Sequence, residues 1–172
     1  MQKIISIDPS KTASAVVAAE RRYEKIECIA YEECSFSKRK CNWVDAYKRA
    51  IQCLEAVIQT SGFGTDVPVL IESWAFARNA RTAVALARAQ QVWICAASQL
   101  GHDVYTMKVT TWQKYVGATK VKNSKEEKNK KKEFVRDWVL KSYGIDDSIT
   151  FDVSDALAMA HAAISGEKLE PL

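Results

Sequence analysis

The sequence predicts an α/β fold built on a five-stranded mixed sheet, in which three antiparallel strands are followed by two parallel ones and helices flank the sheet. Two short apolar runs, residues 3–8 and 67–72, are typical of buried strands because turn residues bound them. Residues 43–60, between these runs, carry apolar side chains at helical spacing. The chain has 172 residues, of which 48% are hydrophobic, and this suits one domain with a proper core.

The N-terminal half is expected to form the antiparallel part of the sheet. Residues 13–20 and 25–31 have the pattern of two further strands, joined by a short polar turn. Connections this short leave no room for a crossover, so these strands form an antiparallel meander with residues 3–8. The helix at 43–60 is the crossover that returns the chain to 67–72, which then pairs parallel with the first strand.

The C-terminal half alternates helices with one more strand. The predicted elements are a long helix at 80–100, a strand at 102–109, a short helix at 110–116, a helix that ends near residue 142, and an alanine-rich helix that begins near residue 152. We expect residues 1–166 to form a single domain and residues 167–172 to form a loose C-terminal tail.

No segment indicates a membrane or an oxidising compartment. No apolar run approaches the roughly 18 residues that a membrane span needs, and no signal-type region precedes the first strand. The five cysteines are odd in number and include no C-x-x-C pair, which argues against a disulfide framework and a zinc ribbon. We therefore expect a soluble, cytoplasmic protein with reduced thiols and no membrane partner.

The positive charge is concentrated in one segment. Residues 120–132 contain seven lysines against two glutamates and carry a net charge of +5, which leaves −1 for the rest of a chain whose total is +4. A basic block of this kind is the expected footprint of a contact with a phosphate backbone, because neutralising phosphates releases condensed counterions. The alternative is a solvated lysine-rich segment without a partner.

Four acids fall where a ligand site would form. Asp8 and Glu72 each end a predicted strand, and ligands bind at the carboxyl edge of central strands in open α/β sheets. Asp152 and Asp155 are three residues apart at a helix start, so both can point to one side of its first turn. Asp8 and the Asp152–Asp155 pair have structural alternatives, since Asp-Pro often opens a turn and D-x-x-D often caps a helix. Four acids at convergent ends favour a shared site.

These acids lie in stretches that resemble the RuvC Holliday-junction resolvases of the RNase H-like superfamily. The matching stretches are 5–9, 71–72, 77–80, 87–90, 116–117 and 152–160, in the family's order and at similar spacings. The resemblance implies an RNase H-like fold and a crossover junction endodeoxyribonuclease that resolves four-way DNA junctions by paired symmetric nicks, in DNA recombination and repair. The long lysine block suits a phage or prophage variant, so the expected cytoplasm is that of a bacterial cell or a phage-infected host.

By this resemblance Asp8, Glu72, Asp152 and Asp155 match the family's four metal-binding carboxylates. Two hard cations can activate a water and stabilise the leaving oxygen of a phosphodiester, and Mg²⁺ prefers carboxylate oxygens. We expect two Mg²⁺ ions per active site, with Mn²⁺ able to substitute, Asp8 as the bridging ligand and Asp152 as a ligand or water-orienting base. Lys128, the nearest lysine by register, is the candidate to neutralise charge on the phosphate, with simple backbone binding as the alternative.

The resemblance also implies contacts with branched DNA. The aromatic residue that stacks on junction bases falls in simple register at Ala75, so Trp74 or Phe76 beside it is expected to take this role. The family's usual glycine after the Asp-Pro pair is Ser10 here. The other DNA-binding candidates are the basic residues Arg78, Arg81, Lys120, Lys122, Lys125, Lys128, Lys130, Lys131 and Lys132.

Three other functions share parts of this pattern. A nuclease of the same fold could act on another branched DNA or on an RNA–DNA hybrid, and the basic block does not exclude it. A non-catalytic nucleic-acid-binding module would not need all four acids. An ATPase or sugar-kinase-like member of the superfamily would need a glycine-rich phosphate loop, and this chain has six glycines with none directly after Asp8.

A homodimer is expected from the substrate and from one helix. A four-way junction is nearly two-fold symmetric, and paired nicks need two active sites, which closed two-fold association supplies. The helix at 80–100 is apolar on more than one side, because Val84, Ile94 and Cys95 lie away from its Leu86–Trp93 face. A single sheet covers one face only, so a second copy is expected to cover the other. The alternative is that the C-terminal helices cover it.

Overall fold

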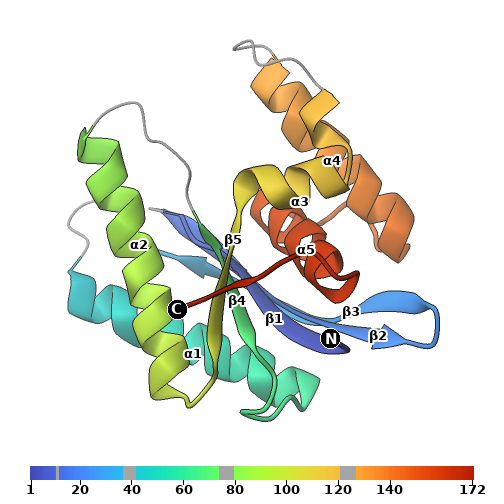
Figure 1. Ribbon diagram of the computed structural model, residues 1–172. Coiled ribbons are helices and arrows are strands. Elements are labelled where there is room, and N and C mark those ends of the chain that lie inside the picture. Colours follow the sequence, from blue (N-terminus) through green and yellow to red (C-terminus); the bar gives the residue numbers. More distant parts are fainter. Residues whose placement is uncertain (11, 37–41, 74–79, 121–126) are drawn as a thin grey trace.

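The structure is a computed structural model that describes residues 1–10, 12–36, 42–73, 80–120 and 127–172, with the backbone alone for residues 120, 127 and 128. Its strands are β1 (Lys3–Asp8), β2 (Ala13–Arg22), β3 (Lys25–Ser35), β4 (Val69–Ser73), β5 (Val104–Lys108) and β6 (Glu170–Pro171). Its helices are α1 (Trp43–Ser61), α2 (Ala80–Gln99), α3 (Val109–Tyr115), the 3₁₀ turn η1 (Ala118–Lys120), α4 (Glu127–Tyr143) and α5 (Phe151–Ile164). The strands form one mixed sheet in the order β3-β2-β1-β4-β5-β6 (Figure 1).

The first three strands form the predicted antiparallel meander. β1 pairs with β2 along its whole length, so that Asp8 lies opposite Ala15. β2 and β3 are longer than predicted because their pairing continues to a turn of only two residues, Tyr23 and Glu24. Tyr23 has a φ of 56°, the left-handed conformation that tight hairpin turns use.

α1 is the crossover that makes the second half of the sheet parallel. The side chain of Asn42 caps its first turn, and Gly62 ends it at a φ of 69°, in the left-handed region that favours glycine. β4 then pairs parallel with β1, with Ile71 opposite Ile7, and β5 pairs parallel with β4. The mixed topology predicted from the sequence is therefore confirmed.

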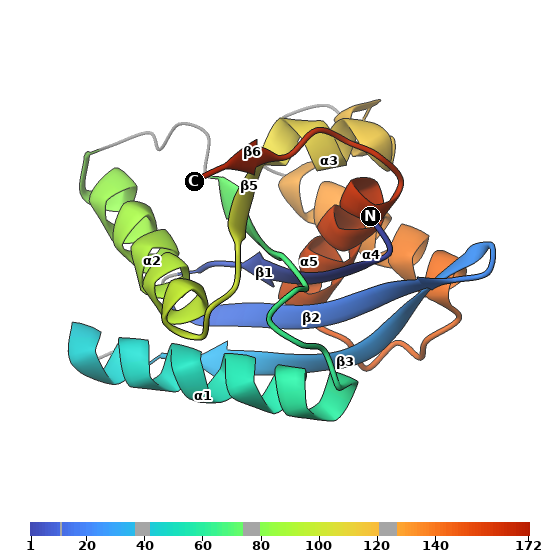
Figure 2. The same cartoon turned by 60° about the horizontal axis from the view of Figure 1, so that its bottom comes forward.

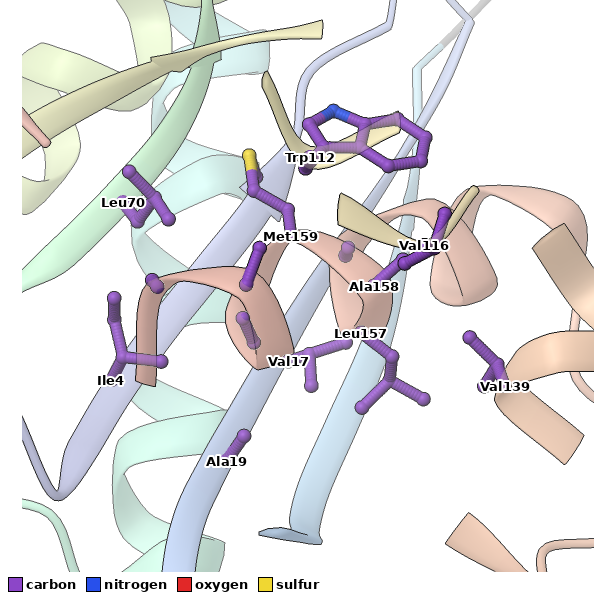
Figure 3. Close-up of a cluster of buried hydrophobic side chains, with 14 of the residues drawn as sticks. Ile4, Val17, Ala19, Leu70, Trp112, Val116, Val139, Leu157, Ala158 and Met159 are labelled. Carbon is purple, nitrogen blue, oxygen red and sulfur yellow. The ribbon is translucent and has the colours of Figure 1, made fainter. Parts of the chain in front are cut away.

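The sheet separates two hydrophobic cores. α1 and α2 cover one face, and α3, α4 and α5 cover the other (Figures 1 and 2). We call the core under α1 and α2 the first core and the core under α3, α4 and α5 the second core. Side chains alternate along β1, so Ile5 and Ile7 point into the first core and Ile4 points into the second. α5 is buried along most of its length, and Figure 3 shows Leu157 and Met159 of this helix packed among side chains of the second core. This burial fixes α5 firmly against the central strands.

The sheet has six strands rather than the five expected. The additional strand, β6, lies in the segment that the sequence indicated as a tail, and it pairs antiparallel with β5 through Glu170 and Pro171. An ion pair of 2.9 Å joins Lys108 Nζ to Glu170 Oε1 beside this pairing. A strand of two residues is too short to leave a periodic pattern, which is why the sequence did not reveal it.

The C-terminal helices do not cover the outer side of α2. They pack in the core on the other face of the sheet, whereas α2 packs against α1 and the parallel strands. Val84 on α2 is 49% exposed, and Cys95 is exposed as well. The alternative in which the C-terminal helices cover this face is therefore wrong. Among the described residues, no helix has the length and hydropathy to cross a lipid bilayer.

Candidate active site

The four acids meet at one edge of the sheet. Asp8 is the last residue of β1 and Glu72 is the last but one of the parallel strand β4. Each follows the last paired isoleucine of its strand, so they lie side by side. A buried hydrogen bond of 2.8 Å from Ser6 Oγ to the carbonyl oxygen of Ala156 ties α5 to β1. Because Asp155 precedes Ala156, this bond sets the distance between the start of α5 and the strand ends.

α5 begins at a threonine and not at an aspartate. Thr150 is the N-cap, and its Oγ1 accepts a hydrogen bond of 3.3 Å from the N–H of Val153. Asp152 lies in the first turn and Asp155 in the next, so neither occupies the cap position. The alternative in which the D-x-x-D pair is the helix cap is therefore wrong, and both carboxylates are available to the site.

Hydrogen bonds through Ser14 connect the turn after Asp8 to Trp93 on α2. Ser14 Oγ on β2 accepts a hydrogen bond of 3.0 Å from the N–H of Ser10 and another of 3.1 Å from Trp93 Nε1. Trp93 is fully buried, so this contact anchors the turn to the core beneath it. The backbone that carries Asp8 is fixed as a result.

Burial and mutual repulsion raise the pKa of three of the acids. For Asp8, the main cause is burial, followed by the negative charges of Glu72, Asp155 and Asp152. Burial also raises the pKa of Glu72, although hydrogen bonds with Trp112 and Asp8 act against it. For Asp155, burial together with the charge of Glu72 raises the pKa to about 7. Such a site disfavours its own negative charge, and a bound cation would relieve it.

Among the described side chains of the basic block, that of Lys132 reaches these acids. Lys132 Nζ on α4 lies 3.8 Å from Asp152 Oδ1, and its charge lowers the pKa of Asp8 against the effect of burial. The ammonium group also lies 5.7 Å from the centre of the Phe151 ring. Register pointed to Lys128, whose side chain lies outside the described residues. Lys132 is therefore a second candidate, beside Lys128, for the lysine that faces the acids.

A tryptophan that the sequence did not single out contacts Glu72. Trp112 on α3 is 1% exposed, and its Nε1 donates a hydrogen bond of 2.9 Å to Glu72 Oε1. β5 pairs with β4 so that Met107 lies opposite Glu72, and α3 begins directly after β5. The pattern at 110–116 predicted only a short helix, because a tryptophan on its inner face gives no sign of a polar partner.

The donor set suits a divalent cation, although it is not already shaped as a ligand cage. Within the described ranges, no three histidine, cysteine, aspartate or glutamate side chains stand as a metal-binding group. The carboxyls of Asp8 and Glu72 lie close enough for each to shift the pKa of the other. Carboxylate oxygens are the donors that Mg²⁺ prefers, and it keeps several waters in addition. A bound cation would offset the repulsion between these carboxylates.

The remaining sequence candidates lie in three places. Arg81 is exposed at the start of α2, and Lys130 and Lys131 lie in the first part of α4, close to Lys132 in the chain. Trp74, Phe76, Arg78, Lys122 and Lys125 lie outside the described residues, as do the side chains of Lys120 and Lys128.

The metal-free protein is expected to lose stability as the pH rises through 7. The raised pKa of Asp155 means that this carboxyl holds its proton to higher pH in the folded protein than in the unfolded chain. The stability that this protonation contributes is complete below about pH 4, decreases as the pH rises, and is lost once the pH has passed about 7. His161 acts in the opposite direction below its usual pKa of 6.5, because burial lowers the pKa of this imidazole. Calorimetry of wild type and Asp155→Asn between pH 6.5 and 8 isolates the effect.

Less than about 1 kcal/mol of this contribution remains at pH 6.5, so wild type should lose about 2–3 °C in Tm over this range, at about 2–4 °C for each kcal/mol, and Asp155→Asn should lose clearly less. Equal pH dependence of the two proteins would contradict the assignment of Asp155 to the acidic cluster.

A mixed sheet of this topology with helices on both faces is an RNase H-like fold, and acids lie at the ends of its adjacent parallel strands. The sequence matches the family model described as crossover junction endodeoxyribonuclease RuvC over residues 4–163. The chain belongs to the RuvC family. No curated protein matches the sequence.

Solved structures share this fold at low sequence identity. The structure of T. thermophilus RuvC in complex with a Holliday junction substrate has a TM-score of 0.75 at 19% identity, with 99% of each chain covered. The yeast mitochondrial Holliday junction resolvase Ydc2 has a TM-score of 0.59 at 10% identity, covering 95% of this chain and 78% of its own. The fowlpox virus Holliday junction resolvase has a TM-score of 0.56 at 13% identity, covering 95% of this chain and 98% of its own.

Proposed function

We propose that this chain is a metal-dependent, structure-specific endodeoxyribonuclease that resolves four-way DNA junctions by paired symmetric nicks. The observation that carries the proposal is the meeting of Asp8, Glu72, Asp152 and Asp155 at one sheet edge in a chain of the RuvC family. Solved structures with the same fold are described as Holliday junction resolvases, and one of them holds a junction. A non-catalytic binding module gives no reason for this costly concentration of buried acids.

The four carboxylates would hold two Mg²⁺ ions, with Mn²⁺ able to substitute. Such a pair supplies an activated water and charge stabilisation at the leaving oxygen. Asp8 is the bridging candidate, since it lies beside Glu72 on the neighbouring strand and its pKa responds to the charges of both acids of α5. Lys132 is held beside Asp152 and would meet the phosphate that enters the site. Lys128 keeps this role as a sequence-based alternative.

The active protein is proposed to be a homodimer that acts on branched DNA in the cytoplasm. A groove of about 540 Å³ lies between the N-terminal turns of α1 and α2, and Val84, Leu86 and Trp43 are among its lining residues. This groove continues the exposed apolar side of α2. Two copies joined there would present two active sites to one junction, as paired cutting requires.

Cleavage of a substrate panel tests this function directly. The protein in Mg²⁺ is incubated with a labelled four-way junction, a flap, a nicked duplex and an RNA–DNA hybrid of matched sequence. Fastest cleavage of the junction, in two strands of like polarity, would support the proposal. Preference for the flap or the hybrid would favour a nuclease of the same fold with another substrate, and binding without cleavage of any substrate would favour a non-catalytic module.

The basic segment of α4 is expected to bind the DNA backbone. Replacing Lys128, Lys130 and Lys131 with Gln should weaken junction binding and reduce the slope of log Kd against log salt by about one unit for each lysine that pairs with a phosphate. Lys132 is left intact so that the acidic site is unchanged. Binding titrations at several salt concentrations provide the measurement.

The matched control for this charge change replaces three exposed lysines elsewhere, namely Lys25, Lys48 and Lys168, with Gln. The control should keep the wild-type slope. A wild-type slope in the α4 variant would mean that its lysines are only a solvated face.

A further inference from the structure

Trp112 stands between the second core and the acidic site. Figure 3 shows its ring beside Met159, with the ring nitrogen on the side away from Val116 and Ala158. The ring is 1% exposed and belongs to the same buried cluster as Leu70, which lies two residues before Glu72 on β4. The ring is therefore held by packing on its apolar side, while its single donor faces the acids.

The hydrogen bond fixes one oxygen of Glu72. A buried indole N–H needs an acceptor, and here that acceptor is Glu72 Oε1 at 2.9 Å. A carboxylate has two oxygens, so Oε1 is occupied by the tryptophan while Oε2 remains free to turn toward another partner. Since a fully packed ring cannot follow a moving carboxylate, the contact restricts the rotation of the Glu72 side chain.

We propose that Trp112 is a positioning residue that holds Glu72 Oε1 and thereby presents Oε2 to a divalent cation. This inference rests on the proposed function in one respect, namely that the partner of Glu72 is a divalent cation. Mutation of a residue that hydrogen-bonds to a metal ligand typically lowers metal affinity about 10–100-fold.

Calorimetric titration with Mn²⁺ tests this role without relying on cleavage. Trp112→Phe removes the N–H donor and keeps an apolar ring, and we expect its Mn²⁺ affinity to fall about 10–100-fold. Trp138→Phe is the matched control, because Trp138 packs against the same core and its ring contacts His161, at 5.0 Å between centroids. The control should keep wild-type affinity, and calorimetric unfolding in the absence of metal confirms that each variant is folded.

A double-mutant cycle separates positioning from general damage to the core. If Trp112 acts through Glu72, adding Trp112→Phe to Glu72→Gln should cause little further reduction of Mn²⁺ affinity. A folded Trp112→Phe with wild-type affinity, or reductions that simply add in the double variant, would overturn the inference.

The indole proton provides a readout that does not depend on metal. The Trp112 Nε1–H resonance, assigned by its absence from Trp112→Phe, should move in metal-free Glu72→Gln because the charged acceptor is removed. An unmoved resonance would overturn the positioning role even if junctions are cut. A moved resonance in Glu72→Gln, together with a wild-type protein that cuts no junction, would instead count against the proposed function alone.

Discussion

Asp8→Asn is expected to abolish cleavage of a four-way junction while leaving junction binding nearly unchanged. Asp8 is buried beside Glu72, and the charges of Asp155 and Asp152 also raise its pKa, so its replacement removes the proposed bridging ligand. We expect a fall in rate of at least about 10³-fold, which corresponds to about 4 kcal/mol of barrier. Glu72→Gln should behave in the same way, because the change removes a metal ligand and not a DNA contact. Single-turnover cleavage and gel-shift binding provide the two measurements.

Stability gives a second signature of the same change. Asp8 is buried among like charges, so the neutral amide should raise the Tm of the metal-free protein while it destroys activity. Asp137→Asn, at an exposed position on α4, is the matched control and should alter neither property. Near wild-type cleavage by Asp8→Asn or Glu72→Gln would show that the metal site is wrongly assigned.

Val84→Glu is expected to convert a dimer into a folded monomer that makes single nicks. Val84 is 49% exposed on the outer side of α2, where neither the sheet nor the C-terminal helices cover it. In a two-fold interface the same residue is buried on both copies, so one substitution places two charges in an apolar contact. Sedimentation at micromolar concentration should show the monomer, and cleavage of a junction with both strands labelled should show uncoupled nicks.

Tyr31→Glu is the matched control for this substitution. Tyr31 lies on β3 and is 42% exposed, so the variant adds the same charge at a similar exposure away from α2. It should remain dimeric and make paired cuts. Wild-type protein that is a stable monomer and still makes paired cuts would rule out the dimer. Ile94, which the sequence placed on the same outer side, packs partly against the core and is therefore not a test position.

The sequence by itself determined the central strands, the crossover and the positions of the four acids. Strand and helix periodicity are local properties, so residues 3–8, 43–60 and 67–72 could be assigned from their own side chains. Asp8 and Glu72 could be expected to converge because topology rules place the ends of neighbouring parallel strands at one edge. The acids of α5 followed from their spacing together with the family resemblance.

Only the tertiary structure decided the details that depend on contacts between distant segments. Thr150 rather than an aspartate caps α5, and β6 joins the sheet edge although two residues carry no pattern. Lys132 and Trp112 reach the acids from α4 and α3, at separations in sequence that no local pattern encodes. Packing of the second core sets these directions, because the ring of Trp112 and the helix of Lys132 are oriented by the side chains beneath them and not by their own neighbours in sequence.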